Sequence, residues 1–268
     1  MLGAAIGILI LGSGHSHEGR TQAETDMLSS KARFMATTLV KQDFKSSPEL
    51  MARAQLLKKK PALQILEKGN TNEKVCALTF DDGPYPAHTE KILNILDQFN
   101  IKATFFMIGS RVDDNPELAR EVFRRGHELG NHTYFHPNLT WLDGPQIQAE
   151  FLATSWTLLR HTGQQVTLAR PPGGQMNSLV KSTMANLGYT TVLWTANPGD
   201  LNGATRDTIV KTFKSKLRPG FVYILHDYPS ETHSALPEII SYAKAKGYRF
   251  VKAGDLLPQS TTGIAARK

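Results

Sequence analysis

Two adjacent carboxylates, Asp81 and Asp82, are the first feature of this sequence that could perform chemistry. They end the apolar run 75–80, which predicts a buried strand, and Gly83 and Pro84 stop that strand. Two acids at the end of a buried strand repel each other and lose solvation unless a cation compensates them. Adjacent aspartates are also common in turns, so the pair indicates either a turn or a metal ligand beside a general base.

Two histidines, His132 and His136, have a spacing that suits a metal site. Pro137 disfavours helical backbone at His136, so a turn is expected, and side chains four residues apart can still converge there. Two imidazoles and one carboxylate form a tripod for Zn²⁺ with a fourth position left for water. The histidine pair is weak evidence by itself, but together with Asp82 it predicts a divalent metal. Zn²⁺ is favoured, and a ligand set without thiolate also suits Co²⁺ or Ni²⁺.

The order of apolar and amphipathic segments along the chain predicts the elements that position these groups. From residue 74 onward, short apolar runs alternate with amphipathic segments, which predicts parallel strands covered by helices. Seven units could close into an incomplete barrel or lie as an open sheet. The strands are expected at 75–80, 103–108, 127–131, 166–169, 190–195, 221–225 and 248–251.

Each candidate site residue follows one of these strands. Besides the aspartates and histidines, Arg170, Asp200 and His226 stand at or just beyond strand ends. The carboxyl ends of parallel strands share one face, and α/β enzymes build their active sites there. Ionisable residues placed by chance would divide between the two ends, so the pattern favours an active site. A structural arginine and a turn aspartate remain the alternatives for Arg170 and Asp200.

Composition argues against several other classes of protein. The chain of 268 residues is 40% hydrophobic and 21% charged, as expected for a globular protein with one substantial domain. Its single cysteine, Cys76, excludes an internal disulfide and lies in the expected buried strand. The net charge of +7 comes from scattered basic residues without interleaved aromatic residues. This argues against a nucleic-acid partner and favours an anionic envelope or polymer.

The chain ends differ in pattern from the expected barrel. Residues 1–12 are almost entirely apolar, which is too short for a comfortable membrane span and matches the core of a signal peptide. The match is imperfect because no Lys or Arg precedes this run, so the expected alternatives for residues 1–20 are a weak signal peptide, an uncleaved membrane anchor, or a true start that lies upstream. A signal peptide or an anchor would export the protein to the periplasm, the cell envelope or the medium. Residues 21–72 are expected to form a helical extension with a linker, and 259–268 a flexible tail.

Four motifs in this order resemble those of the NodB-type polysaccharide deacetylases, carbohydrate esterase family four. The resemblance covers roughly residues 74–257. It implies that 73–258 form a NodB homology domain, folded as a distorted (β/α)7 barrel, which removes acetyl groups from a glycan with the help of a metal. The motifs are Thr79-Phe80-Asp81-Asp82-Gly83-Pro84, His132-Thr133-x-x-His136, Arg170-Pro171-Pro172 and Ile224-Leu225-His226.

The resemblance also implies roles for the residues in these motifs. Asp82, His132 and His136 would hold the metal. Asp81 would be the general base toward a metal-activated water, and His226 the general acid toward the leaving amine. An amide needs all of these, because it is a poor electrophile with a poor leaving group.

Further residues would support the base, the acid and the acetyl group. Arg170 would hold the base ionised, and Asp200 would raise the pKa of the acid. The backbone N–H of Gly173 would donate to the oxyanion, and Leu201 and Ile224 would line a pocket for the acetyl methyl group.

The sequence departs from the family pattern at three of its positions. The family often has an aromatic residue where Gly173 stands, a tryptophan where Leu201 stands, and an acid where Asn197 stands. A backbone N–H donor survives a glycine, so the chemistry is expected to persist. The loss of two aromatic rings opens the pocket and leaves the substrate less defined.

Three functions remain as hypotheses. The first is N-deacetylation of N-acetylglucosamine in peptidoglycan, in a chitin-like polymer or in a secreted polysaccharide. The second is an O-acetyl esterase for acetylated xylan or a similar polymer, because the same residues would cleave the easier ester. The third is a non-catalytic glycan-binding module, which loss of Asp81 or His226 would indicate; both are present. In each case the expected partner is an acetylated polysaccharide, with membrane association through the N-terminus.

Overall fold

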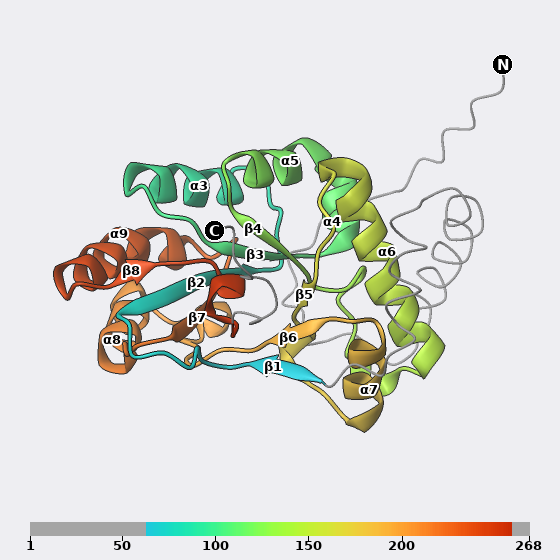
Figure 1. Ribbon diagram of the computed structural model, residues 1–268. Helices are drawn as coiled ribbons and strands as arrows, with labels where there is room; N and C mark the ends of the chain where they lie inside the picture. The colour runs from blue at the N-terminus through green and yellow to red at the C-terminus, as the bar shows by residue number, and fades with distance from the viewer. Residues whose placement is uncertain (1–62, 259–268) are drawn as a thin grey trace, which may run out of the picture.

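A parallel sheet curls into a distorted barrel with helices around its outside (Figure 1). The computed structural model describes residues 63–258. The expected fold class is confirmed, and all seven expected strands are present to within a few residues. No helix in this part of the chain is long and apolar enough to cross a membrane. The expected signal peptide or anchor at 1–20, residues 21–62 of the expected extension, and the tail at 259–268 lie outside the described residues.

The strands pair in the order β1-β6-β5-β4-β3-β2-β7, all parallel, and β8 pairs with the start of β2. A parallel bridge between Ala196 and Tyr223 joins the chain beyond β6 to β7, which brings the two ends of the curl together. The strands are β1 (Gln64–Leu66), β2 (Val75–Asp81), β3 (Thr104–Met107), β4 (Glu128–Asn131), β5 (Leu168–Ala169), β6 (Thr190–Val192), β7 (Phe221–His226) and β8 (Arg249–Phe250).

Helices connect successive strands from β2 onward and cover the outer face of the sheet (Figure 1). The longest of them begins at a capping box, in which Asp143 and Gln146 satisfy each other's backbone N–H groups, and ends at Gly163 in the left-handed conformation. The helices are α3 (His88–Gln98), α4 (Gly109–Asp114), α5 (Pro116–Arg124), α6 (Gly144–Thr162), α7 (Ser178–Asn186), α8 (Arg206–Lys216) and α9 (Ser230–Ala245).

The alternation of side chains along β2 decides which residues reach the barrel interior. Cys76, Leu78 and Phe80 pack in the large outer core beneath α3, α5, α8 and α9. Ala77 points the other way, into a smaller inner core that the sheet itself encloses. Because the side-chain period of a strand is two, Asp81 shares the inner face with Ala77. The fold therefore delivers this carboxylate to the carboxyl end of the barrel interior.

One expectation is wrong for residues 63–72, the described part of the expected helical extension. Gln64–Leu66 form β1, which pairs in parallel with β6 and places Gln64 opposite Thr190. The sheet therefore begins before residue 73. A three-residue strand carries too short a pattern to distinguish it from a helix, and its conformation is set by the partner strand rather than by local propensity.

Gly130 in β4 provides a test of packing inside the barrel. A Cβ at this position would overlap the ring of Phe106, which is fully buried in the inner core. We expect Gly130→Ala to lower the free energy of unfolding by about 1–3 kcal/mol, because the ring must move. Gly144→Ala is the control, since a Cβ there meets only Leu179 Cδ1, at 3.6 Å. Urea denaturation measures both, and equal midpoints would contradict the prediction.

Candidate active site

Strand pairing brings the candidate residues together at one end of the barrel. Asp81, the last residue of β2, lies directly opposite His226, the last residue of β7. Asn131 at the end of β4 lies opposite Ala169 at the end of β5. The residues that follow these two strands, His132 and Arg170, are therefore neighbours. The expected gathering of polar groups at the carboxyl ends of the strands is present.

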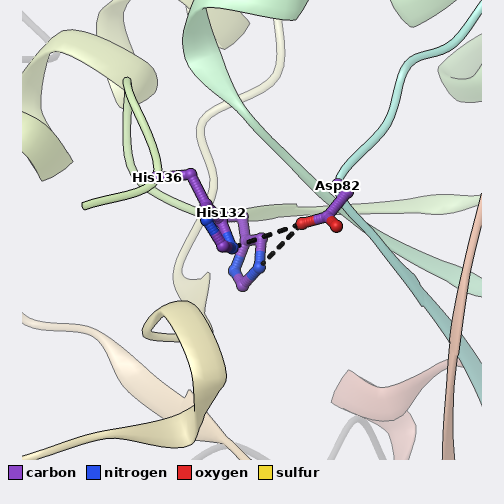
Figure 2. Close-up of side chains that lie close together, drawn as sticks. All are labelled: Asp82, His132 and His136. Carbon is purple, nitrogen blue, oxygen red and sulfur yellow. Dashed lines mark ion pairs between the residues drawn. The ribbon is translucent and has the colours of Figure 1, made fainter. Parts of the chain in front are cut away.

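Asp82, His132 and His136 form a compact cluster of potential metal ligands (Figure 2). The Oδ1 atom of Asp82 lies 3.3 Å from Nε2 of His136 and 3.5 Å from Nε2 of His132. One ligand atom from each residue lies within 4.8 Å of the other two. The two imidazoles come from the loop after β4 and face the carboxylate across the mouth of the barrel (Figure 2).

The surroundings of Asp82 fit a cation. Both of its carboxylate oxygens are buried and accept no hydrogen bond within residues 63–258. A buried carboxylate without partners is costly unless a positive charge compensates it. Burial opposes ionisation, but the imidazoles of His136 and His132 hold the pKa of this carboxyl well below its usual range. The donor set of one carboxylate and two imidazoles matches what Zn²⁺ and similar divalent metals bind.

The tautomer of His132 is fixed by a neighbouring carbonyl. Its Nδ1 lies 2.7 Å from the backbone oxygen of Arg170. A carbonyl oxygen only accepts hydrogen bonds, so Nδ1 carries the proton and donates it. The Nε2 lone pair is then directed toward Asp82, which is the arrangement of a metal-binding histidine with an outer hydrogen-bond partner.

Backbone strain is concentrated at this cluster. Asp82 has a φ of 76°, Thr133 of 67° and His136 of 58°, all in the left-handed region that residues with a side chain rarely adopt. Such conformations cost about 1–3 kcal/mol each and persist only where the surroundings enforce them. At Asp82, a hydrogen bond from the guanidinium of Arg111 to the backbone oxygen helps to hold the left-handed conformation.

The base candidate, Asp81, is bound by a buried arginine. Arg170 NH1 lies 2.6 Å from Asp81 Oδ1 and also donates to Thr79 Oγ1, at 2.9 Å. The same guanidinium donates to the backbone oxygens of Val192, the last residue of β6, and Leu193, the residue after it, at 2.9 and 3.0 Å. Both charged side chains are buried. The rigid fork of the guanidinium therefore makes four hydrogen bonds to fixed acceptors, which orients the carboxylate.

The acid candidate, His226, is held by Asp200. Its Nδ1 donates to Asp200 Oδ1 at 2.9 Å, and its backbone N–H donates to Asp200 Oδ2 at 2.8 Å. Thr232 Oγ1 donates to the same Oδ2 at 2.8 Å. Burial lowers the pKa of His226, but the hydrogen bond and charge of Asp200 outweigh it and raise the pKa to about 9. At neutral pH the imidazole therefore keeps a proton that it can donate.

The expected pocket residues are distributed over three elements. Ile224 is buried and lies on β7 two residues before His226, on the same face of the strand. Leu201 directly follows Asp200 in a short 3-10 turn and is half-buried. Gly173 is exposed, with a φ of 61°, in the turn after β5. The three residues lie on separate elements, so the acetyl pocket stays a prediction.

Several supporting residues were not expected. Thr79 supports Arg170, and its position two residues before Asp81 is the signal that it shares the inner face. Thr232 supports Asp200 from α9, which no sequence pattern indicates. Glu150 is fully buried and accepts hydrogen bonds from the histidine loop. Its signal is a charge on the apolar face of α6, three residues after Ile147.

Comparison with known proteins identifies the family. A profile of the polysaccharide deacetylase family matches residues 68–192. A peptidoglycan-N-acetylglucosamine deacetylase of Bacillus cereus is 38% identical over 191 residues, which cover 69% of this chain and 89% of that relative. The chain belongs to the polysaccharide deacetylase family. It is a hydrolase of carbohydrate esterase family four, as the sequence motifs indicated.

Two further relatives of this polysaccharide deacetylase agree with the assignment. The peptidoglycan-N-acetylmuramic acid deacetylase PdaA of Bacillus subtilis is 34% identical over 193 residues, covering 70% of this chain and 73% of PdaA. The crystal structure of the Bc1960 peptidoglycan N-acetylglucosamine deacetylase superposes with a TM-score of 0.70 at 32% identity. That superposition covers 72% of this chain and 92% of the Bc1960 chain.

The buried ion pair predicts strong coupling in stability. Arg170→Met leaves the Asp81 carboxylate buried without its cation, and we expect a loss of about 3–5 kcal/mol in the free energy of unfolding. Adding Asp81→Asn removes the uncompensated charge, so the double variant should lose less than the sum of the two single variants. Urea denaturation of all four proteins measures the coupling. Additivity within about 0.5 kcal/mol would contradict it.

The Asp200–His226 hydrogen bond predicts a pKa difference. Asp200→Asn removes the largest influence that raises this pKa, so the pKa of His226 should fall from about 9 toward its ordinary value of 6.5. NMR titration of the ring protons measures it in each protein. Because the pKa is raised in the folded wild-type chain, its stabilising effect is present below pH 6.5 and is lost as the pH rises through about 9. The variant should lack this loss, and an unchanged pKa would refute the assignment.

Proposed function

We propose that this protein hydrolyses the N-acetyl groups of peptidoglycan, with N-acetylglucosamine residues as its first substrate. One observation carries the proposal: two adjacent buried carboxylates have separate partners. Asp82 faces two histidines, whereas Asp81 pairs with Arg170 and lies opposite His226. Carboxyl groups placed side by side in different environments are suited to different tasks in one reaction. The relatives named above, which act on peptidoglycan, support this substrate class.

Asp82, His132 and His136 would hold the divalent metal, with Zn²⁺ favoured and Co²⁺ or Ni²⁺ as alternatives. When bound, such a metal polarises the acetyl carbonyl and lowers the pKa of a water molecule. The tautomer that Arg170 imposes on His132 keeps the coordinating nitrogen free of a proton. The buried oxygens of Asp82, which accept no hydrogen bond within residues 63–258, would supply the negative charge that attracts the cation.

Asp81 would take the proton of the attacking water. Its ion pair with Arg170 orients it and directs one oxygen away from the guanidinium, toward His132 at 3.6 Å. His226 would then donate a proton to the nitrogen as the amide bond breaks, since an amine leaves readily only when protonated. Asp200 keeps that imidazole charged and oriented through Nδ1, which leaves Nε2 for the substrate.

The acetyl group would be held by residues that flank the acid and base. We assign the backbone N–H of Gly173 to the developing oxyanion. The methyl group would contact Ile224, two residues from His226, and Leu201, next to Asp200. The absence of a side chain at Gly173 leaves room above this position, because a Cβ there would meet only Gln175, at 3.7 Å.

The substrate class also suggests where the protein works. Peptidoglycan lies outside the cytoplasmic membrane, so we infer export to the cell envelope or beyond it. The apolar residues 1–12 support this as a signal peptide or as an anchor that keeps the enzyme near its substrate. The net charge of +7 favours association with an anionic envelope.

Acetate release tests the proposal. Wild-type protein supplied with Zn²⁺ or Co²⁺ should release acetate from peptidoglycan and from N-acetylglucosamine oligomers, and a chelator should abolish this reversibly. Asp81→Asn should lower kcat by about 10²–10⁴-fold, the usual contribution of a general base, while Co²⁺ binding persists.

Two outcomes would count against the proposed function. If no acetylated glycan yields acetate when metal is supplied, the enzymatic assignment to these substrates fails. If only O-acetyl esters such as acetylated xylan react, the protein is an esterase and the amide substrate is wrong. Loss of Co²⁺ binding in Asp81→Asn would instead show that this residue serves the metal rather than the proton.

A further inference from the structure

The loop that carries the two histidines depends on acceptors outside its own backbone. None of the backbone N–H groups from residue 132 to 136 donates to a carbonyl within that loop. They donate to Met107 O (from His132, 3.0 Å), Asn131 Oδ1 (from Thr133, 2.9 Å), Glu150 Oε2 (from Tyr134, 2.8 Å, and Phe135, 2.9 Å) and Thr133 Oγ1 (from His136, 3.1 Å).

Glu150 is the acceptor that a helix contributes to this loop. It lies on the buried face of α6 and has no exposed surface. A single oxygen, Oε2, receives the N–H groups of both Tyr134 and Phe135, which are the central residues of the loop. A buried carboxylate is tolerated where hydrogen bonds of this kind compensate its lost solvation. The buried carboxylate of Glu150 therefore binds the segment of backbone that lies between the two histidines.

The other hydrogen bonds of the histidine loop do not replace the two that Glu150 accepts. On the other side, the N–H groups of Gly109 and Ser110 at the start of α4 donate to the carbonyls of Thr133 and Tyr134. These bonds hold the oxygen side of the same two peptide groups whose N–H groups Glu150 accepts. Glu150 fixes the second side, so the segment is gripped between α4 and α6.

The hydrogen bonds to Glu150 matter because the backbone of the loop is strained near His136. Both Thr133 and His136 have positive φ values, 67° and 58°. The side chain of His136 is also the more exposed of the two imidazoles, at 16% against 2% for His132. Without acceptors for the central N–H groups, the loop can relax toward ordinary backbone conformations. His136 would then turn away from Asp82.

We propose that Glu150 is a positioning residue for the metal site: it holds the backbone at Tyr134 and Phe135 so that His132 and His136 converge on Asp82. It does not touch the metal itself. The inference rests on the proposed function only in that these three residues are taken as the ligands. It assigns to a buried residue of α6 an effect on metal affinity, which nothing in the four sequence motifs indicates.

Two substitutions at Glu150 separate hydrogen bonding from packing. Glu150→Gln keeps the size and one acceptor oxygen, so it should bind Co²⁺ about as tightly as the wild-type chain. Glu150→Leu removes the acceptor, and we expect the Kd for Co²⁺ to rise about 10–100-fold, as for other outer partners of metal ligands. Titration followed by the visible absorption of Co²⁺ reports affinity and ligand geometry without any measurement of activity.

Glu128 supplies the matched control. It lies at the opposite end of β4, where its Oε2 accepts from the N–H of Gly254 and from Thr104 Oγ1. Glu128→Leu should therefore destabilise the fold in a similar way and leave Co²⁺ binding unchanged. If Glu150→Leu does not fold, Glu150→Asp takes its place, because the shorter side chain cannot reach both N–H groups and should weaken Co²⁺ binding while Glu150→Gln does not.

The outcomes distinguish this inference from the proposed function. If the wild-type chain binds Co²⁺ and Glu150→Leu, or Glu150→Asp in its place, binds equally well, the role of Glu150 is refuted and the metal site stands. If Glu150→Gln weakens binding as much as the leucine or aspartate variant, hydrogen bonding is not the cause and the inference also fails. If the wild-type chain binds no divalent metal, the metal site, the proposed mechanism and the role of Glu150 all fall.

Discussion

The buried ion pair between Arg170 and Asp81 is the interaction on which the rest of the site depends. Arg170 is fully enclosed, and its guanidinium binds the base on β2 and two carbonyl oxygens at the end of β6. Its own backbone oxygen accepts the Nδ1 proton of His132, which lies beyond β4. One residue thus ties three strand ends together and sets both the orientation of the candidate base and the tautomer of a candidate metal ligand. A lysine could not do this, because it lacks the planar fork of donors.

Adjacent aspartates can have different tasks because the backbone separates their surroundings. Asp81 lies on the inner face of β2, where the pleat directs it to Arg170. The next residue leaves the strand in a left-handed conformation, which points Asp82 toward the histidines. One carboxylate is compensated by a fixed guanidinium, and the other faces two imidazoles with which it could hold a cation. Neither arrangement is stable without the other residues, so the pair cannot be read as an ordinary turn.

Sequence indicates the strands and most of the site, and its failures have identifiable causes. The strand ending at Asp81 is predictable because seven consecutive residues are buried and turn residues follow. The strand Gln64–Leu66 is missed because its conformation is set by β6, more than 120 residues away along the chain. Thr232 and Glu150 are missed because they reach the site from helices, and helix periodicity shows which face is buried but not which loop lies opposite. The shape of the acetyl pocket cannot be predicted from the sequence, because it depends on the turns at Gly173 and Leu201.

The two ends of the barrel differ in what their polar groups do. At the amino end, Glu128 accepts hydrogen bonds from Thr104 and from the N–H of Gly254, and the second bond fastens the C-terminal turn. At the carboxyl end, Asp82 is buried without hydrogen bonds, and left-handed backbone recurs at Thr133 and His136. Unsatisfied charge and strained backbone lower the stability of the fold. They therefore accumulate only where another requirement outweighs this loss of stability. A cation that binds the folded chain and not the unfolded one would return part of that stability through linkage. Metal binding is therefore expected to complete the rigid active site. The loop held by Glu150 is the part that must be ordered before the metal binds.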